Sequence, residues 1–203
     1  MAQTSSRTSI ISTARNLMLH HGYAATSVDD ICSTAKVTKG SFYHYFESKE
    51  AVAIAVLNAF YDEGISRLIN GPYVDMSDSK SRLLSFFDHL ETIGPELWRD
   101  GCLIGNFACE FAESSPVIRR RVAAMFDALV KQLAPLFEPV AKEGEGAAEL
   151  AEYTLMVIEG AVVMARAHAD PSRISSALRI LRGTIEARIG ATSKEGAKAN
   201  HRR

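Results

Sequence analysis

Two short helices separated by a three-residue turn are predicted near the N-terminus, and this arrangement constrains the fold more than any other feature. Thr26 and Asp29 have the spacing of a capping box, and apolar residues follow at helical intervals to about Ala35. After the turn at residues 36–38, the hydroxyl of Thr38 can cap a second helix. This spacing is that of a helix-turn-helix, whose second helix enters the major groove of DNA.

The second helix of this pattern has two different faces. Phe42 and Phe46 lie one turn apart and can anchor one face in a core. The other face carries ammonium, hydroxyl and ring donors, and the free N–H groups at the helix start attract phosphate. The residues expected to contact DNA are Thr26, Ser27, Lys36, Thr38, Lys39, Gly40, Ser41, Tyr43, His44 and Lys49.

Three runs of sequence, at residues 14–17, 22–31 and 39–50, resemble the DNA-binding domain of the TetR/AcrR family of transcriptional regulators. The resemblance covers roughly the first quarter of the chain. It implies an all-helical, homodimeric regulator whose larger C-terminal domain binds a small molecule and thereby changes the affinity for double-stranded DNA. It favours repression from a palindromic operator.

The charge of the chain limits how it can bind DNA. A formal net charge of -1 gives no global attraction to nucleic acid, so a local basic face has to supply the affinity. The cations near the motif are opposed by nearby carboxylates, and we expect modest non-specific binding. These cations are Arg7, Lys36, Lys39 and Lys49, and the carboxylates are Asp29, Asp30, Glu47 and Glu50.

Hydrophobic patterning predicts an all-α fold, because apolar residues recur at helical intervals and no run alternates with a period of two. We expect a three-helix DNA-binding domain at residues 4–64, with the helix-turn-helix at about 27–46. A helical ligand-binding and dimerisation domain should follow at 65–190, and the polar tail at 191–203 is predicted to be disordered. A long helix from about Glu47 to Asn70 should link the domains, and Gly94 and Pro95 should end another.

The segment at residues 150–169 is apolar on nearly all sides and must be covered on all of them. It can be a central core helix. Alternatively, the family resemblance implies that it and the last helix form a four-helix bundle with their copies in a second subunit. We expect such a two-fold homodimer, with Val162 at the subunit contact.

Ligand sites in helical domains are apolar cavities with a few placed polar groups. The candidates here are Phe86, His89, Trp98, Cys102, Phe107, Phe111, Met125, Tyr153, Met156 and Glu159, and most of the aromatic ones can equally be core residues. Glu159 is notable because a carboxylate in an apolar helix must be paired, hydrogen-bonded or solvated. It can contact a ligand, pair with Arg166 or lie at the subunit contact.

Residues 101–110 are similar to a segment in a TetR subgroup that includes the repressor of N-ethylmaleimide reductase and an acrylate-responsive repressor. The resemblance implies that Cys102 stands where some members carry a redox or electrophile sensor. A thiol at a helix N-terminus, with Arg99 nearby in sequence, is placed to have its thiolate stabilised. Cys102 can equally line a pocket or the core, and Cys32 and Cys109 are interpreted as small core residues.

The sequence gives little support to an enzyme. The adjacent His20 and His21 point about 100° apart on a helix, so they cannot form the zinc-binding pair of residues i and i+4. The Gly-Glu-Gly run at 144–146 follows no strand and lacks the third glycine of a dinucleotide cradle. We expect no catalytic residue, metal or cofactor. An architectural DNA-binding protein without a ligand is the further alternative, but it would not need the large apolar C-terminal part.

The sequence also bears on where the chain works. It contains neither the layout of a signal peptide nor an apolar run of about 18 residues, so we expect a soluble, cytoplasmic protein without a membrane partner. Its three scattered cysteines suit a reducing compartment better than a disulfide framework.

Overall fold

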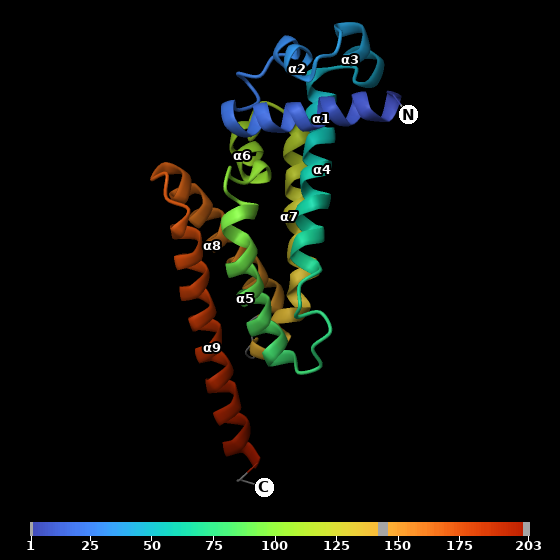
Figure 1. Cartoon of the computed structure of the whole chain (residues 1–203). Coiled ribbons are helices and arrows are strands. Elements are labelled where there is room, and N and C mark those ends of the chain that lie inside the picture. Colours follow the sequence, from blue (N-terminus) through green and yellow to red (C-terminus); the bar gives the residue numbers. More distant parts are fainter. Residues whose placement is uncertain (1, 142–145, 201–203) are drawn as a thin grey trace. The chain divides into compact units, whose positions relative to one another are not determined.

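The computed structural model of the chain describes the backbone of residues 2–141 and 146–200, and the side chains of residues 6–141 and 146–190. Every regular element in this part is a helix, which confirms the all-α prediction (Figure 1). The α-helices are α1 (Ala2–His21), α2 (Val28–Ala35), α3 (Lys39–Tyr45), α4 (Lys49–Ile69), α5 (Ser79–Leu97), α6 (Leu103–Glu110), α7 (Pro116–Phe137), α8 (Ala147–Ala167) and α9 (Ser172–Asn200), with a short 3-10 helix, η1 (Glu138–Val140), after α7.

The helices form two compact units that do not follow the chain in order. The first unit joins the N-terminal part, up to residue 66, with residues 100–125, and the second joins residues 67–99 with the chain from residue 126 onward. The sequence suggested a division near residue 64. The difference arises because α6 and the start of α7 pack with the first three helices rather than with their neighbours in sequence.

In the first unit, α1 packs against both α2 and α3 (Figure 1). Ile10, Ala14 and Met18 of α1 are fully buried, as are Ile31 from α2 and Phe42 from α3. Gly22, with a φ of +83°, ends α1 in the left-handed region that glycine adopts without strain. The helix-turn-helix therefore rests on a packed three-helix core.

In the second unit, α9 packs along both α5 and α8. Gly94 allows this approach, because a Cβ there would lie 3.0 Å from the ring of Trp98 and 3.2 Å from Leu178 on α9. The prediction that Gly94 and Pro95 end a helix was wrong, since α5 continues through Pro95 to Leu97. Packing of this segment against α9 outweighs the backbone hydrogen bond that proline removes.

The predicted disorder after residue 190 also differs from the structure, in which the backbone of α9 is helical to Asn200. Residues 191–200 contain no proline, and half of them are alanine or lysine, which propagate a helix once it has begun. The end of the tail, at 201–203, lies outside the described residues, as does most of the glycine run at 144–146. None of the described helices is long and apolar enough to cross a membrane.

Candidate DNA-binding and effector sites

The cap of α2 lies one residue later than the sequence suggested. Ser27 accepts a hydrogen bond from the N–H of Asp30 at 3.1 Å, and the Asp30 carboxylate accepts from the N–H of Ser27 at 2.9 Å. The Ser27 hydroxyl also donates to the Asp30 carboxylate at 2.6 Å, and this bond, followed by the one from the Ser27 N–H, holds the pKa of Asp30 below its usual value. Thr26, also predicted to contact DNA, is buried and donates its hydroxyl to the carbonyl of Gly22 at 2.8 Å, so it supports the loop from within.

The turn and the start of α3 match the prediction. Lys36 adopts a left-handed conformation, with a φ of 56°, and its N–H closes α2 on the carbonyls of Cys32 and Ser33. Thr38 accepts a hydrogen bond from the N–H of Ser41 at 3.1 Å, which confirms it as the cap of α3. The two helices are thereby fixed at the ends that meet in the turn.

The faces of α3 divide as expected. Phe42 and Phe46 are buried, with their ring centroids 5.9 Å apart. On the opposite side Tyr43 is 54% exposed and His44 is exposed as well. The remaining exposed members of the predicted DNA-facing set are Ser27, Lys36, Thr38, Lys39 and Gly40, and Ser41 is half-buried.

Lys39, at the start of α3, is held by an acidic neighbour. Its ammonium group lies 2.7 Å from the carboxylate of Asp29 on α2, and both side chains are exposed. The hydrogen bond that Lys39 donates to Asp29 raises the pKa of Lys39 above its usual value. A DNA phosphate that binds this lysine must therefore compete with Asp29.

Lys49, which was predicted to contact DNA, contacts Tyr23 in the free protein. Its ammonium group donates to the carbonyl of Tyr23 at 2.9 Å and lies 3.9 Å from the centre of the Tyr23 ring. This contact ties the start of α4 to the loop between α1 and α2. Lys49 therefore positions that loop in the free protein.

A junction that the sequence did not predict connects α6 with the loop before α2. The carboxylate of Glu110 accepts the N–H of Tyr23 at 2.9 Å and the N–H of Ala24 at 2.7 Å. The rings of Phe107 and Phe111 lie with their centroids 6.3 and 4.6 Å from that of Tyr23. Burial, followed by the charges of Glu50 and Glu110, raises the pKa of Tyr23. We call this contact the α6 junction.

Of the three cysteines, Cys109 differs from expectation in its exposure. Cys102 occupies the N-cap position of α6, as predicted for a thiol at a helix N-terminus, and is 6% exposed. Cys109 was expected in the core, but it is exposed. It lies two residues after the buried Phe107 and therefore on the other side of the helix. Cys32 is buried as expected, and burial raises the pKa of its thiol.

The ten predicted ligand residues are divided between the two units. Cys102, Phe107, Phe111 and Met125 are buried in the first unit, and the other six belong to the second. Of those six, Phe86 and Trp98 are buried, His89 and Glu159 are half-buried, and Tyr153 and Met156 are exposed. The ring of His89 is 2.8 Å from the carbonyl oxygen of Arg67, which indicates a structural role.

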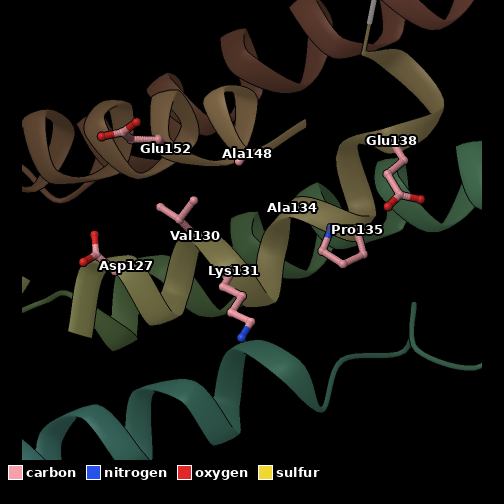
Figure 2. Close-up of a pocket in the computed structure, with 8 residues that line it drawn as sticks. All are labelled: Asp127, Val130, Lys131, Ala134, Pro135, Glu138, Ala148 and Glu152. Carbon is pink, nitrogen blue, oxygen red and sulfur yellow. The ribbon is translucent and has the colours of Figure 1, made fainter. Parts of the chain in front are cut away.

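Two adjoining cavities lie between α7 and α8 in the second unit, and we call them together the α7–α8 groove. The smaller has a volume of about 260 Å³ and is lined by Phe126, Asp127, Val130, Glu152, Leu155, Met156 and Glu159. The larger has a volume of about 410 Å³ and is lined by Asp127, Val130, Lys131, Ala134, Pro135, Glu138, Ala148 and Glu152 (Figure 2). Met156 and Glu159 are thus the predicted ligand residues that line a cavity of the groove.

The surface of α8 also carries an exposed apolar strip, which we call the α8 strip and which consists of Tyr153, Met156, Val163 and Met164. Val162, the residue predicted at the subunit contact, is only 2% exposed and packs inside the unit. On α9, Ile180 is 70% exposed. Among the described residues, no group of three potential metal ligands was found.

Comparisons with known proteins agree with this geometry. A family model described as bacterial regulatory proteins, tetR family, matches residues 10–56. A second model, for the C-terminal domain of LmrA/YxaF-like transcriptional regulators, matches residues 85–179. Together they span more than half of the chain.

Individual relatives are also similar to this chain. The transcriptional regulator AcuR of Cereibacter sphaeroides is 30% identical over 84% of this chain and 81% of its own. The repressor DhaR of Mycobacterium sp. (strain GP1) is 37% identical over 64% of this chain, but the match spans only 65% of DhaR. The repressor NemR of Escherichia coli (strain K12) is 30% identical over 56% of this chain and 57% of its own. The crystal structure of a regulatory protein TetR from Rhodobacter sphaeroides superposes with a TM-score of 0.74 at 27% identity, covering 87% of this chain and 97% of that one.

Proposed function

The chain belongs to the tetR family of bacterial regulatory proteins, and on that basis we propose that it is a homodimeric repressor that a small molecule releases from a palindromic operator. The matched families are transcriptional regulators, so the chain is a DNA-binding regulator rather than an enzyme. A regulator of bacterial genes works on chromosomal DNA, and we place this one in the cytoplasm.

The observation that carries the DNA-binding role is the two-sided surface of α3. Buried Phe42 and Phe46 fix the orientation of the helix, so Tyr43 and His44 project from the unit. Lys39 stands at the first turn, where backbone N–H groups also attract phosphate. This arrangement provides phosphate contacts from the start of α3 and base-edge contacts from its exposed rings.

The dimer is supported by the apolar surface of α8 and α9. The α8 strip and Ile180 are exposed in the single chain, although apolar side chains of this size usually gain by burial. Ideal Cβ atoms at Gly160 and Gly183 would meet nothing within 4 Å, so a second copy could approach these helices closely. Two copies present two α3 helices to the two halves of a palindrome.

The release mechanism that we propose acts through the α6 junction. Glu110 and the phenylalanine rings of α6 hold the loop that leads into α2, so a displacement of α6 changes the setting of the helix-turn-helix. A ligand that prefers the released state by about 1–3 kcal/mol weakens DNA binding roughly 5- to 150-fold. The alternative trigger is covalent modification of Cys102 at the N-cap of α6.

The test is operator binding by Lys39→Ala and Tyr43→Phe, measured by gel shift on a palindromic promoter fragment over a range of salt concentrations. We expect both substitutions to weaken binding, and Lys39→Ala to lower the slope of log affinity against log salt by about one. Lys131→Ala is the matched control, because this exposed lysine lies on α7 in the second unit. Wild-type affinity in both α3 variants would refute the assignment.

A further inference from the structure

The α7–α8 groove combines an apolar lining with carboxylates around it. Its smaller cavity is lined by Phe126, Val130, Leu155 and Met156, and their side chains offer dispersion contacts and exclude water. Figure 2 shows Val130 projecting from α7 toward α8, so this side chain lies between the two walls. A ligand in the groove would bury part of its own apolar surface here.

The charges around the smaller cavity are all negative. Asp127 stands on α7, and Glu152 and Glu159 stand on α8. Among the described residues, neither Asp127 nor Glu152 has an ion pair with a basic side chain. Lys131 lines only the larger cavity, and its ammonium group points away from Glu152 and α8 (Figure 2). The groove therefore has a surplus of negative charge beside an apolar surface.

From this charge and lining, we propose that the α7–α8 groove binds a small organic cation that carries its positive charge on an apolar body. An anion entering the same space would meet two or three like charges, whereas a cation would be attracted to them. The cavity of about 260 Å³ suits a compact ligand of about one aromatic ring and a substituted ammonium group. The role of this cation as the effector rests on the proposed function.

Two other occupants fit the observations less well. A metal ion would need a cluster of ligands, and no group of three His, Cys, Asp or Glu side chains close enough to hold one was found in the described part of the chain. A second copy of the chain is the closer competitor, because Met156 belongs both to the groove and to the α8 strip. A second copy that lay over the whole groove, and not only over the α8 strip, would have to bury the carboxylates of Asp127 and Glu152, which costs free energy unless basic side chains of that copy reach them.

The experiment uses the full-length protein with benzyltrimethylammonium as the cation and phenylacetate as an anion of similar size. Binding is measured by calorimetry at constant ionic strength. We expect the cation to bind and the anion not to bind. We further expect Asp127→Asn and Glu152→Gln each to raise the dissociation constant about two- to fivefold, the range of an exposed charge pair. Glu113→Gln, an exposed carboxylate of the first unit, is the control and should bind as the wild type does.

Three results would overturn the inference: equal binding of the anion, no binding of the cation, or unchanged affinity in both groove variants. If the cation fails to bind and the two variants strengthen the dimer in ultracentrifugation, the occupant is the second copy. A gel shift on the operator, run in parallel, separates this inference from the proposed function. Protein that binds the operator but not the cation overturns only the groove assignment, and protein that binds the cation but no operator overturns the proposed function.

Discussion

Glu110→Gln tests whether the α6 junction holds the loop that leads into the helix-turn-helix. One carboxylate accepts two backbone N–H groups there, from Tyr23 at 2.9 Å and from Ala24 at 2.7 Å. Glutamine has nearly the same shape but only one accepting oxygen, so its NH₂ group would face the second N–H. The substitution therefore removes at least one of the two hydrogen bonds and replaces it with two opposed donors.

The size of the effect follows from the geometry. A hydrogen bond to a charged group contributes about 1.5–3 kcal/mol. The bond to Ala24 is exposed, and its N–H can turn to water when the carboxylate is lost, whereas the N–H of Tyr23 is partly buried. We therefore expect a loss of about 1–2 kcal/mol of unfolding free energy. In a chain of this length that corresponds to a fall in Tm of roughly 2–8 °C.

Hydrogen exchange measures the junction most directly. Amide exchange in a peptide that contains Tyr23 and Ala24 should accelerate about 5- to 30-fold in Glu110→Gln, because local opening costs less by the same 1–2 kcal/mol. Glu113→Gln is the control, since this carboxylate is exposed and lies only three residues away. If the two variants exchange and melt alike, the carboxylate of Glu110 does not hold the loop, and the proposed route from α6 to the helix-turn-helix fails.

Three further predictions follow from the same contacts. Asp29→Asn should free Lys39 from its 2.7 Å ion pair and strengthen operator binding by up to about fivefold in a gel shift at low salt. Unchanged affinity would show that the ion pair does not compete with DNA phosphate. Val163→Glu should give a folded monomer in ultracentrifugation and weak operator binding in gel shift, whereas the same change at buried Val162 should unfold the chain. A Val163→Glu protein that remains a dimer would disprove the subunit contact through the α8 strip. Cys102→Ser should keep operator binding but lose release by a maleimide, with mass spectrometry to identify the labelled thiol; release that persists would leave Cys102 as a packing residue.

The local parts of the helix-turn-helix could be predicted from sequence because short-range hydrogen bonds determine them. The cap at Thr38, the turn and the buried face of α3 depend on residues within one or two helical turns of each other. The cap of α2 shows where this reasoning stops. Thr26 with Asp29 and Ser27 with Asp30 have the same spacing, and burial of Thr26 against Gly22 selects the second pair. Burial comes from tertiary packing, which local spacing does not contain.

The wrong predictions farther along the chain also arise from tertiary packing. Val162 and Val163 are adjacent and chemically identical, yet one is 2% and the other 63% exposed, because an apolar helix gives no sequence signal for which side meets its own unit. Pro95 marks a helix end in isolation but lies within α5, where packing against α9 supports the helix. Glu110 lies 87 positions after Tyr23 and 86 positions after Ala24 in the sequence, so no local pattern can reveal its contacts with them.

The assignment of α6 to the first unit changes how a signal can reach DNA. Cys102 occupies the N-cap position of α6 and Glu110 forms its other end, so a modified thiol would act on the helix-turn-helix within a single compact unit. A ligand in the α7–α8 groove binds in the second unit, and the chain passes from there to the first within the uninterrupted helices α4 and α7. A covalent effector at Cys102 and a reversible effector in the groove would thus change DNA binding by separate routes. The two routes would share the α6 junction only if a movement of α7 also moves α6. In that case Glu110→Gln would weaken the response to both, and otherwise it would weaken the response to the thiol reagent alone.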